Sequence, residues 1–252
     1  MKKIIKIIYF TIFKIILFKF TSKKAIYIHI PRSIGTNLKY QVEQKMLFSR
    51  IIYFNHQKSN SYIYKKFKNH ITFTFVRNPI NWYLSYYNYK KVRNLQRGGK
   101  KNILENETFK NFFDDIILEI NGVSGIKKWH QPFEENSIIG KLTKIKNKEI
   151  GFYTKLFLIY ICDNEKKFLN SKIDYSYATN IINKFGFENI YKQENFIEAI
   201  KDLNNKFQTT LDHTLKINES IKQTKIEDLS KNEIATIKKK DYLIFKIFDY
   251  KY

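Results

Sequence analysis

The segment YIHIPRSIGTN, residues 27–37, carries side chains well suited to hold an anion. A short β-rich run leads into a loop with Arg32 and Ser33, and the chain beyond Gly35 is compatible with a helix. The first turn of a helix exposes unpaired backbone N–H groups and a partial positive charge, which both favour a phosphate. Arg32 adds a cation that can bond two oxygens at once, and Ser33 and Thr36 add hydroxyl donors. The chemistry expected here is the binding of a phosphate-like group.

A second set of polar residues follows the run ITFTFV at residues 71–76. Arg77 comes directly after this run, and Ser85 lies about two helical turns further along the next stretch. An arginine at the end of a strand and a serine on the following helix can converge on one anion. Arg77 and Ser85 are therefore a second pair of candidate binding residues.

A histidine is the side chain best suited to take a proton from a hydroxyl near neutral pH. The chain has five: His29, His56, His70, His130 and His213. We expect His29, inside a predicted strand, to be structural and His70 to be exposed. His56 follows the run RIIYF at residues 50–54, so it is predicted to share the carboxyl edge of a parallel sheet with the two arginines. An ordinary loop histidine is the alternative for His56, and His130 is the reserve candidate or a contact of an acceptor.

These residues need strands and helices that bring them together. Three short, apolar and β-rich runs are predicted strands: residues 25–30, 50–54 and 71–76. Helix-compatible stretches lie between or after them: residues 36–48, 80–95, 109–120, 176–185 and 194–207. Strands that alternate with helices are typical of βαβ units and a parallel sheet.

The last part of the chain is mainly helical in pattern. A weaker strand is predicted at residues 187–191, and a capping box at Ser230 and Glu233 opens a last helix that runs to about residue 248. We therefore expect an α/β fold, a three-layer P-loop-like domain with a central parallel sheet and extra C-terminal helices.

The loop at residues 27–37 resembles the HIPKTGGTS-type loop of PAPS-dependent carbohydrate sulfotransferases, the group that includes heparan sulfate 2-O-sulfotransferase. In that family the loop binds the 5′-phosphosulfate of the donor, 3′-phosphoadenosine 5′-phosphosulfate (PAPS). The resemblance places Arg32 where a lysine contacts the bridging oxygen of the leaving phosphate. The rest of the cradle is matched by Ser33, Gly35, Thr36 and Asn37. Ile34 departs from the usual Gly or Ala, and a β-branched residue tolerates left-handed backbone angles poorly.

The segment FTFVRNP, residues 73–79, together with Ser85 resembles the FxFVRxPxxRxxSxY block of the same family. There the first arginine and the serine bind the 3′-phosphate of the donor, which implies this role for Arg77 and Ser85. The second arginine of the family is replaced here by Tyr83 or its neighbour Trp82.

The resemblance runs in order from residue 25 onward, more weakly at residues 185–207, 218–220 and 240–242. It implies a sulfotransferase that moves a sulfuryl group from PAPS, in line, to a hydroxyl of a carbohydrate, with His56 as the base and Arg32 at the leaving group. No metal is expected, because the histidines and acidic residues lack ligand spacing and the single Cys162, in an apolar run, excludes thiolate clusters.

The formal net charge of +23 attracts anions of any kind. The lysines are scattered and the whole composition favours Lys, Asn, Ile, Tyr and Phe, so no specific nucleic-acid partner is expected. The alternatives are a P-loop kinase or phosphotransferase, whose G-x-x-x-x-G-K-[ST] motif is missing here, and a non-enzymatic binder of nucleic acid or anionic surfaces. An inactive relative stays open because of Ile34.

Residues 1–20 are apolar but interrupted by lysines, and the uninterrupted stretch at residues 7–13 is too short to span a membrane. They form either a basic amphipathic helix on an anionic membrane surface or a start that packs on the domain or is loosely ordered. Residues 21–252 are expected to be the sulfotransferase domain. One cysteine favours a reducing compartment, so we expect a cytoplasmic protein, and whether residues 1–20 attach it to a membrane depends on which of these two alternatives holds; a Golgi-type membrane anchor is the alternative location.

Overall fold

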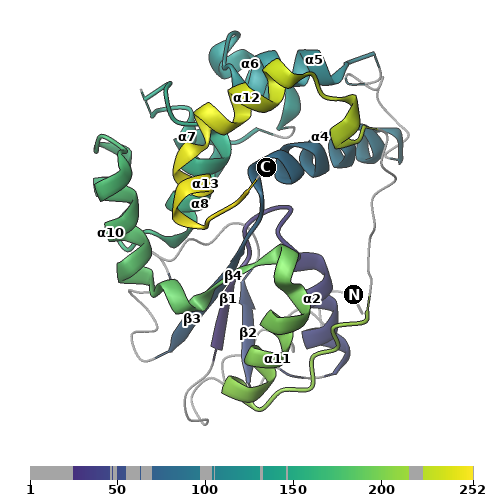
Figure 1. The fold of residues 1–252 in the computed structure, drawn as a ribbon, viewed down its shortest axis with the longest axis vertical. Coiled ribbons are helices and arrows are strands. Elements are labelled where there is room, and N and C mark those ends of the chain that lie inside the picture. Colours follow the sequence, from purple (N-terminus) through teal and green to yellow (C-terminus); the bar gives the residue numbers. More distant parts are fainter. Residues whose placement is uncertain are drawn as a thin grey trace, which may run out of the picture.

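The computed structural model describes residues 25–45, 47, 50–54, 63, 70–96, 104, 106–130, 133–145, 147–215 and 224–251. Its centre is a four-stranded, all-parallel sheet in the order β2-β1-β3-β4 (Figure 1). The strands are β1 (Ala25–Ile28), β2 (Ile51–Phe54), β3 (Ile71–Val76) and β4 (Ile190–Lys192). The predicted α/β fold with a central parallel sheet is confirmed.

The strands hold β-branched and aromatic residues whose side chains fit a pleated surface that is covered on both sides. In the register of the central strands, Tyr27 lies beside Tyr53 on β2 and Phe73 on β3. The Thr74 hydroxyl donates a buried hydrogen bond of 2.8 Å to the Ile28 carbonyl, so β1 and β3 are joined by a side chain as well as by their backbones.

One face of the sheet packs against α2 (Gly35–Gln44) and α11 (Phe196–Phe207) (Figure 1). Tyr27, Phe73 and Phe75 point to this side and meet apolar residues of both helices. The helix residues in this layer are Leu38, Val42, Ala199, Ile200, Leu203 and Phe207.

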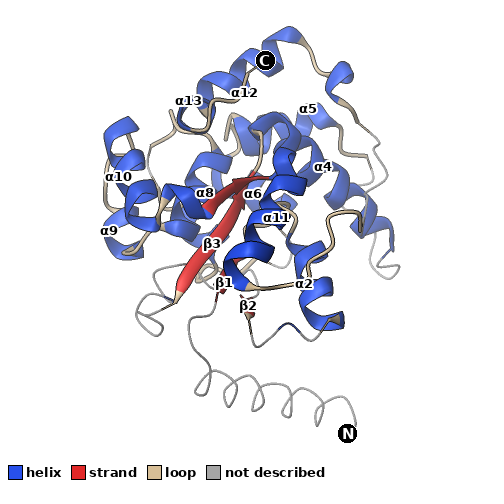
Figure 2. Cartoon of the chain, turned by 60° about the horizontal axis from the view of Figure 1, so that its bottom comes forward, coloured by secondary structure: helices blue, strands red, loops and turns tan. Residues whose placement is uncertain are grey.

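The other face belongs to the larger part of the core, where Ile26, Ile28 and Val76 join the remaining helices. These include α4 (Pro79–Gln96), α8 (Phe152–Ile161), α10 (Tyr175–Phe185), α12 (Lys231–Lys240) and α13 (Tyr242–Ile247). With helices on both sides of the strands, the domain has three layers (Figure 2). The expected extra C-terminal helices are present as α12 and α13.

The remaining elements are short, and most of them lie between β3 and β4 along the chain. The helices are α5 (Phe109–Phe112), α6 (Gly122–Trp129), α7 (Ile138–Leu142) and α9 (Glu165–Leu169). A π-helical turn spans Phe113–Ile117, and 3-10 turns span Phe187–Asn189, Gln193–Asn195 and Ile226–Asp228. The predicted helix at residues 109–120 is therefore α5 followed by the π-helical turn, and the predicted strand at 187–191 starts only at Ile190, after a 3-10 turn.

Helix α8 has no exposed face, because every one of its residues is buried. Periodicity therefore did not predict it. Cys162 caps this helix inside the core, and burial raises the pKa of its thiol to about 12, as expected for a small buried residue. In the described residues, no helix combines the length and apolarity that crossing a membrane requires. Three sequence-based predictions lie outside the described residues: those for residues 1–20, His56 and residues 218–220.

Candidate anion-binding site

The order of the strands reverses direction at β1, next to the segment that follows β1. After β1 the chain moves to β2 on one side, and β3 then pairs on the other side of β1. In open parallel sheets, such a reversal leaves a space beyond the ends of the two adjacent strands, where ligands bind. Residues 29–34, which we call the β1–α2 loop, follow β1, and Arg77 follows β3. The two predicted anion-binding segments therefore meet at this edge.

The β1–α2 loop alternates between left-handed and right-handed backbone. Arg32 has φ 66° and Ile34 has φ 56°, whereas Ser33 between them keeps a negative φ. Such alternation turns successive N–H groups toward one side and makes a concave anion site. The left-handed angle expected to be difficult for Ile34 is indeed adopted, at a cost of roughly 1–2 kcal/mol for an L-residue.

Helix α2 begins directly at this concave site. Gly35 and Thr36 form its first turn, and in the described part of the chain their backbone N–H groups have no acceptor. A Cβ added to Gly35 would lie 1.8 Å from the ring of His29, so only glycine fits. His29, the first residue of the loop, is buried, and its Nδ1 lies 2.5 Å from the Tyr53 hydroxyl.

Arg32 extends from the loop to α4. Its Nε and Nη2 donate to the Ser85 hydroxyl at 3.1 and 3.0 Å, and its guanidinium lies 4.4 Å from the centre of the Tyr89 ring. Among the ion pairs between described residues, none involves Arg32. Burial and the nearby Arg77 lower the pKa of Arg32 to about 10, so it stays charged at neutral pH. The site thus holds two neighbouring cations and favours an anion between or beside them.

Arg77 is joined to the loop and to α8. Its Nη1 donates to the Arg32 carbonyl at 3.2 Å, and its backbone N–H donates to the Tyr153 hydroxyl at 2.8 Å. The Ser33 hydroxyl is fully buried and makes no hydrogen bond of good geometry, with the Tyr153 hydroxyl as its polar neighbour. A buried hydroxyl whose polar neighbour is poorly aligned is costly, and an oxygen of a bound anion placed beside it would satisfy it.

The end of β3 is also held by an acidic residue that the sequence did not single out. The two carboxylate oxygens of Glu194 accept hydrogen bonds of 2.9 Å, one from the backbone N–H of Asn78 and one from the Tyr250 hydroxyl. Glu194 and Tyr153 could not be identified from sequence, because they stand far from Arg77 along the chain and belong to no local motif. Their role is to fix the backbone that presents Arg77.

The Asn37 side chain is bonded to partners outside the β1–α2 loop. Its amide nitrogen donates to the Leu215 carbonyl, and its amide oxygen accepts from Gln41 at 2.6 Å. Gln41 in turn exchanges hydrogen bonds with the backbone of Asp212, at 2.8 and 2.5 Å. The Asn37 side chain therefore holds residues 209–215 on α2, and its predicted contact with a donor nucleotide stays a prediction.

His130 is joined to α4, the helix that carries Ser85, through its contact with Tyr86. The Tyr86 hydroxyl is 2.8 Å from Nδ1 of His130, and the two rings stack at 5.1 Å. Burial, together with Lys90, lowers the pKa of His130 well below its usual range, so the ring is neutral at pH 7. His213 is exposed, and His70 stands before β3, at the opposite end of the strand from Arg77.

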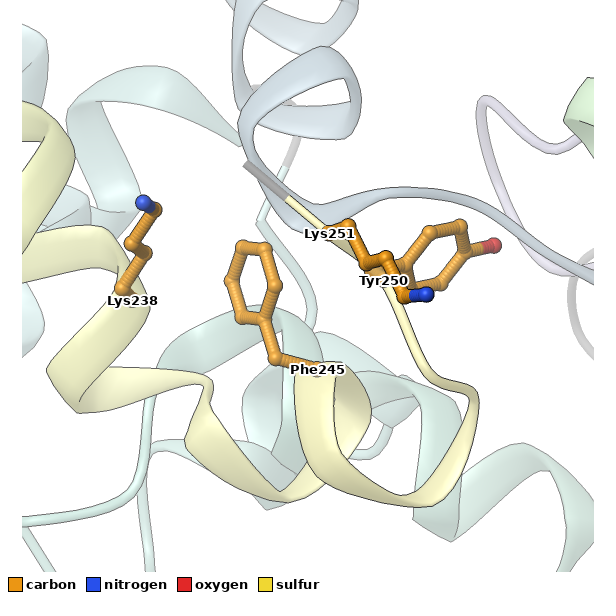
Figure 3. A pocket seen from close by; sticks show the side chains of 4 residues that line it. All are labelled: Lys238, Phe245, Tyr250 and Lys251. Carbon is orange, nitrogen blue, oxygen red and sulfur yellow. The ribbon is translucent and has the colours of Figure 1, made fainter.

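A shallow pocket of about 350 Å³ lies over the C-terminal helices (Figure 3). It is lined by Lys238, Phe245, Tyr250 and Lys251. Through the bond from Tyr250 to Glu194 this pocket is joined to the backbone at the end of β3. Within the described residues, no group of His, Cys, Asp or Glu side chains is arranged to hold a metal ion.

Comparisons of the chain with protein-family models, with curated proteins and with solved structures found no match.

Proposed function

We propose that this protein is a sulfotransferase that moves a sulfuryl group from PAPS to a hydroxyl. The observation that carries the proposal is the contact between the two motifs. Arg32 of the first motif bonds Ser85 of the second, and Arg77 of the second bonds the backbone of the first. Two candidate anion-binding segments in contact suit a donor with two separate phosphate groups, such as PAPS.

The proposed division of the donor follows the geometry. The N–H groups of Arg32, Ile34, Gly35 and Thr36, with the Ser33 hydroxyl, would hold the 5′-phosphosulfate in a P-loop-like cradle. Arg77 and Ser85 would hold the 3′-phosphate. Arg32, which belongs to the loop and bonds Ser85, would lie between the two groups and stabilise the charge that develops on the leaving phosphate.

The reaction needs an acceptor oxygen in line with the bond that breaks. The oxygen of the acceptor hydroxyl forms a bond to sulfur while the bond from sulfur to the bridging phosphate oxygen breaks, and 3′-phosphoadenosine 5′-phosphate (PAP) leaves with the electron pair. The hydroxyl proton passes to a base. We assign this role to His56, which follows β2 along the chain, with His130 as the reserve. A carbohydrate acceptor is supported by the resemblance of the two motifs.

Calorimetric titration with PAP tests the donor site. We expect wild-type protein to bind PAP and Arg77→Ala to lose that binding, because the 3′-phosphate and the loop both lose a cation. Arg50→Ala is the matched control: it removes the same charge from an exposed arginine at the amino end of β2 and should leave PAP affinity within about twofold.

Two results would contradict the proposal. Binding of ATP that requires Mg²⁺, without binding of PAP, would indicate a kinase or another phosphotransferase instead. Equal loss of PAP affinity in Arg77→Ala and Arg50→Ala would show that only the general positive charge attracts the nucleotide.

Transfer of labelled sulfate from PAPS to a set of carbohydrate acceptors tests the chemistry. His56→Ala should keep PAP affinity but lose turnover by roughly 100-fold or more, the usual contribution of a general base. His213→Ala replaces an exposed histidine and should keep full turnover. Full turnover in His56→Ala would remove His56 from the mechanism and direct attention to His130.

A further inference from the structure

Three consecutive carbonyl oxygens of the β1–α2 loop accept hydrogen bonds from side chains of three different elements. The donors lie on α4, at the end of β3 and in β1. The bonds are Trp82 Nε1 to Pro31 O at 2.8 Å, Arg77 Nη1 to Arg32 O at 3.2 Å and Tyr27 Oη to Ser33 O at 2.8 Å. We call these three bonds the carbonyl clamp.

The carbonyl clamp decides where the N–H groups of the loop point. In a trans peptide, the C=O and the following N–H point in opposite directions, so a fixed carbonyl also fixes the next N–H group. Holding the Pro31 and Ser33 carbonyls therefore orients the N–H groups of Arg32 and Ile34. The N–H of Ser33 is used within the loop, where it donates to the Ile30 carbonyl at 3.2 Å.

The clamp also accounts for left-handed backbone at residues that disfavour it. Arg32 and Ile34 both have positive φ, and neither is a glycine. Each such residue costs roughly 1–2 kcal/mol, a cost that persists only where the surroundings determine the conformation. The hydrogen bonds to the carbonyls of Pro31, Arg32 and Ser33 hold the backbone of Arg32 and Ile34 in this conformation.

Trp82 and Tyr27 are suited to this task because they are held rigidly. Trp82 is fully buried, and its ring stacks between Tyr86 at 5.1 Å and Tyr153 at 4.7 Å. Tyr27 is buried in the sheet layer, and burial raises the pKa of its hydroxyl well above the usual value, so it keeps the proton that it donates. Neither side chain needs to touch a ligand to act.

We propose that Trp82 and Tyr27 are positioning residues that hold the β1–α2 loop in its anion-binding conformation before a ligand arrives, in the place of glycine. The inference rests on the proposed function in one respect, that the ligand of this loop is the phosphate end of a nucleotide. Its consequence is specific: a glycine at position 34 should make the clamp less necessary.

The test is a double-mutant cycle on PAP affinity, measured by calorimetry. Trp82→Phe removes the indole N–H together with part of the ring, and the loss of the hydrogen bond should weaken PAP binding about tenfold, the upper range for one hydrogen bond. In an Ile34→Gly background, where the left-handed angle carries no cost, the same substitution should weaken binding by less than about threefold. This rescue separates positioning of the loop from a general structural role of the indole.

Trp129→Phe is the matched control. Trp129 is equally buried, and its indole N–H donates to Asp115 at 2.9 Å, in a different part of the core. It should leave PAP affinity within about twofold even if it lowers the melting temperature. Equal effects of Trp82→Phe and Trp129→Phe on PAP affinity, or an unchanged effect of Trp82→Phe in the Ile34→Gly background, would overturn the inference.

A second series covers a failure to fold. If Trp82→Phe does not fold, Tyr27→Phe removes the hydroxyl donor of the carbonyl clamp instead. Tyr87→Phe is its control, since the Tyr87 hydroxyl donates to the Glu107 carbonyl. Absence of PAP binding to wild-type protein would refute the proposed function alone. The same cycle would then be run with inorganic pyrophosphate, and the inference fails if pyrophosphate does not bind or if the clamp variants bind it like wild type.

Discussion

Gly35 and His29 form a contact that leaves no room for a side chain at the start of α2. A Cβ at position 35 would come within 1.8 Å of His29, and the His29 ring is itself held between Tyr27 and the Tyr53 hydroxyl. At the scale of single residues, this explains the glycine of the loop better than its backbone angles do, because Gly35 is right-handed and helical while Arg32 and Ile34 take the left-handed positions.

Gly35→Ala should therefore destabilise the protein by overpacking, by about 1–3 kcal/mol or more in the free energy of unfolding. Denaturant unfolding measures this change. In a His29→Ala background the ring is absent, so the added methyl group should cost less than about 1 kcal/mol. If Gly35→Ala lowers the free energy of unfolding equally with and without the His29 ring, the close contact is not the cause.

At the scale of elements, the C-terminal helices show a tertiary contact at Asp241 interrupting a helix that the local sequence predicts to be continuous. The capping box of Ser230 and Glu233 opens α12 as predicted, but the helix ends at Lys240 and a new one starts at Tyr242. Asp241, at the break, turns its carboxylate into the core. There it accepts hydrogen bonds from the Tyr83 hydroxyl at 2.8 Å and from the backbone and side chain of Thr154 at 2.8 and 2.7 Å.

Burial raises the pKa of Asp241 to about 6, against a lowering by its hydrogen bonds. The folded protein thus holds this proton more tightly than the unfolded chain, whose aspartate titrates near its ordinary pKa of 3.8. Stability from the protonated carboxyl is fully present below that value and is lost as the pH rises through about 6.

We therefore expect the free energy of unfolding of wild type, minus that of Asp241→Asn, to fall by about 2 kcal/mol between pH 4 and pH 6. The asparagine cannot titrate, so any fixed cost of the substitution leaves this slope unchanged. Urea unfolding at a series of pH values measures it. A difference that is constant with pH, or that rises, would show that the folded protein does not raise the pKa of Asp241.

At the scale of the whole molecule, a net charge of +23 draws anions toward the protein without selecting among them. Selection in the proposed site comes from two partly buried arginines and from fixed N–H groups, which salt screens less than exposed lysines. A compact nucleotide and a long polyanion should therefore respond differently to ionic strength.

PAP affinity should fall less than about tenfold between about 50 and 200 mM salt, whereas any binding of duplex DNA should fall by about 100-fold or more. Calorimetry for PAP and fluorescence anisotropy for labelled DNA provide the two measurements. DNA binding that survives the higher salt concentration, beside PAP binding that does not, would favour a nucleic-acid-binding protein over the proposed enzyme.

The sequence by itself determined the parallel strands and the polar residues that follow them. Arg32 follows β1 and Arg77 follows β3, and parallel strands of one sheet end at the same edge, so the sequence placed both arginines at that edge, and the pairing of β1 with β3 made them neighbours. The departure of Ile34 from the family's usual Gly or Ala likewise indicated a left-handed backbone angle at this position, and Ile34 does adopt one.

Only the tertiary structure decided what holds that loop and what Asn37 and Asp241 do. The deciding bonds join residues far apart along the chain: 51 positions from Pro31 to Trp82, 158 from Tyr83 to Asp241 and 178 from Asn37 to Leu215. Local patterns reflect the periods of strands and helices, and they carry no information on which distant carbonyl a buried indole or hydroxyl will reach. The conformation of the proposed phosphate loop is set by such partners, because its own residues, without a glycine at position 34, do not favour it.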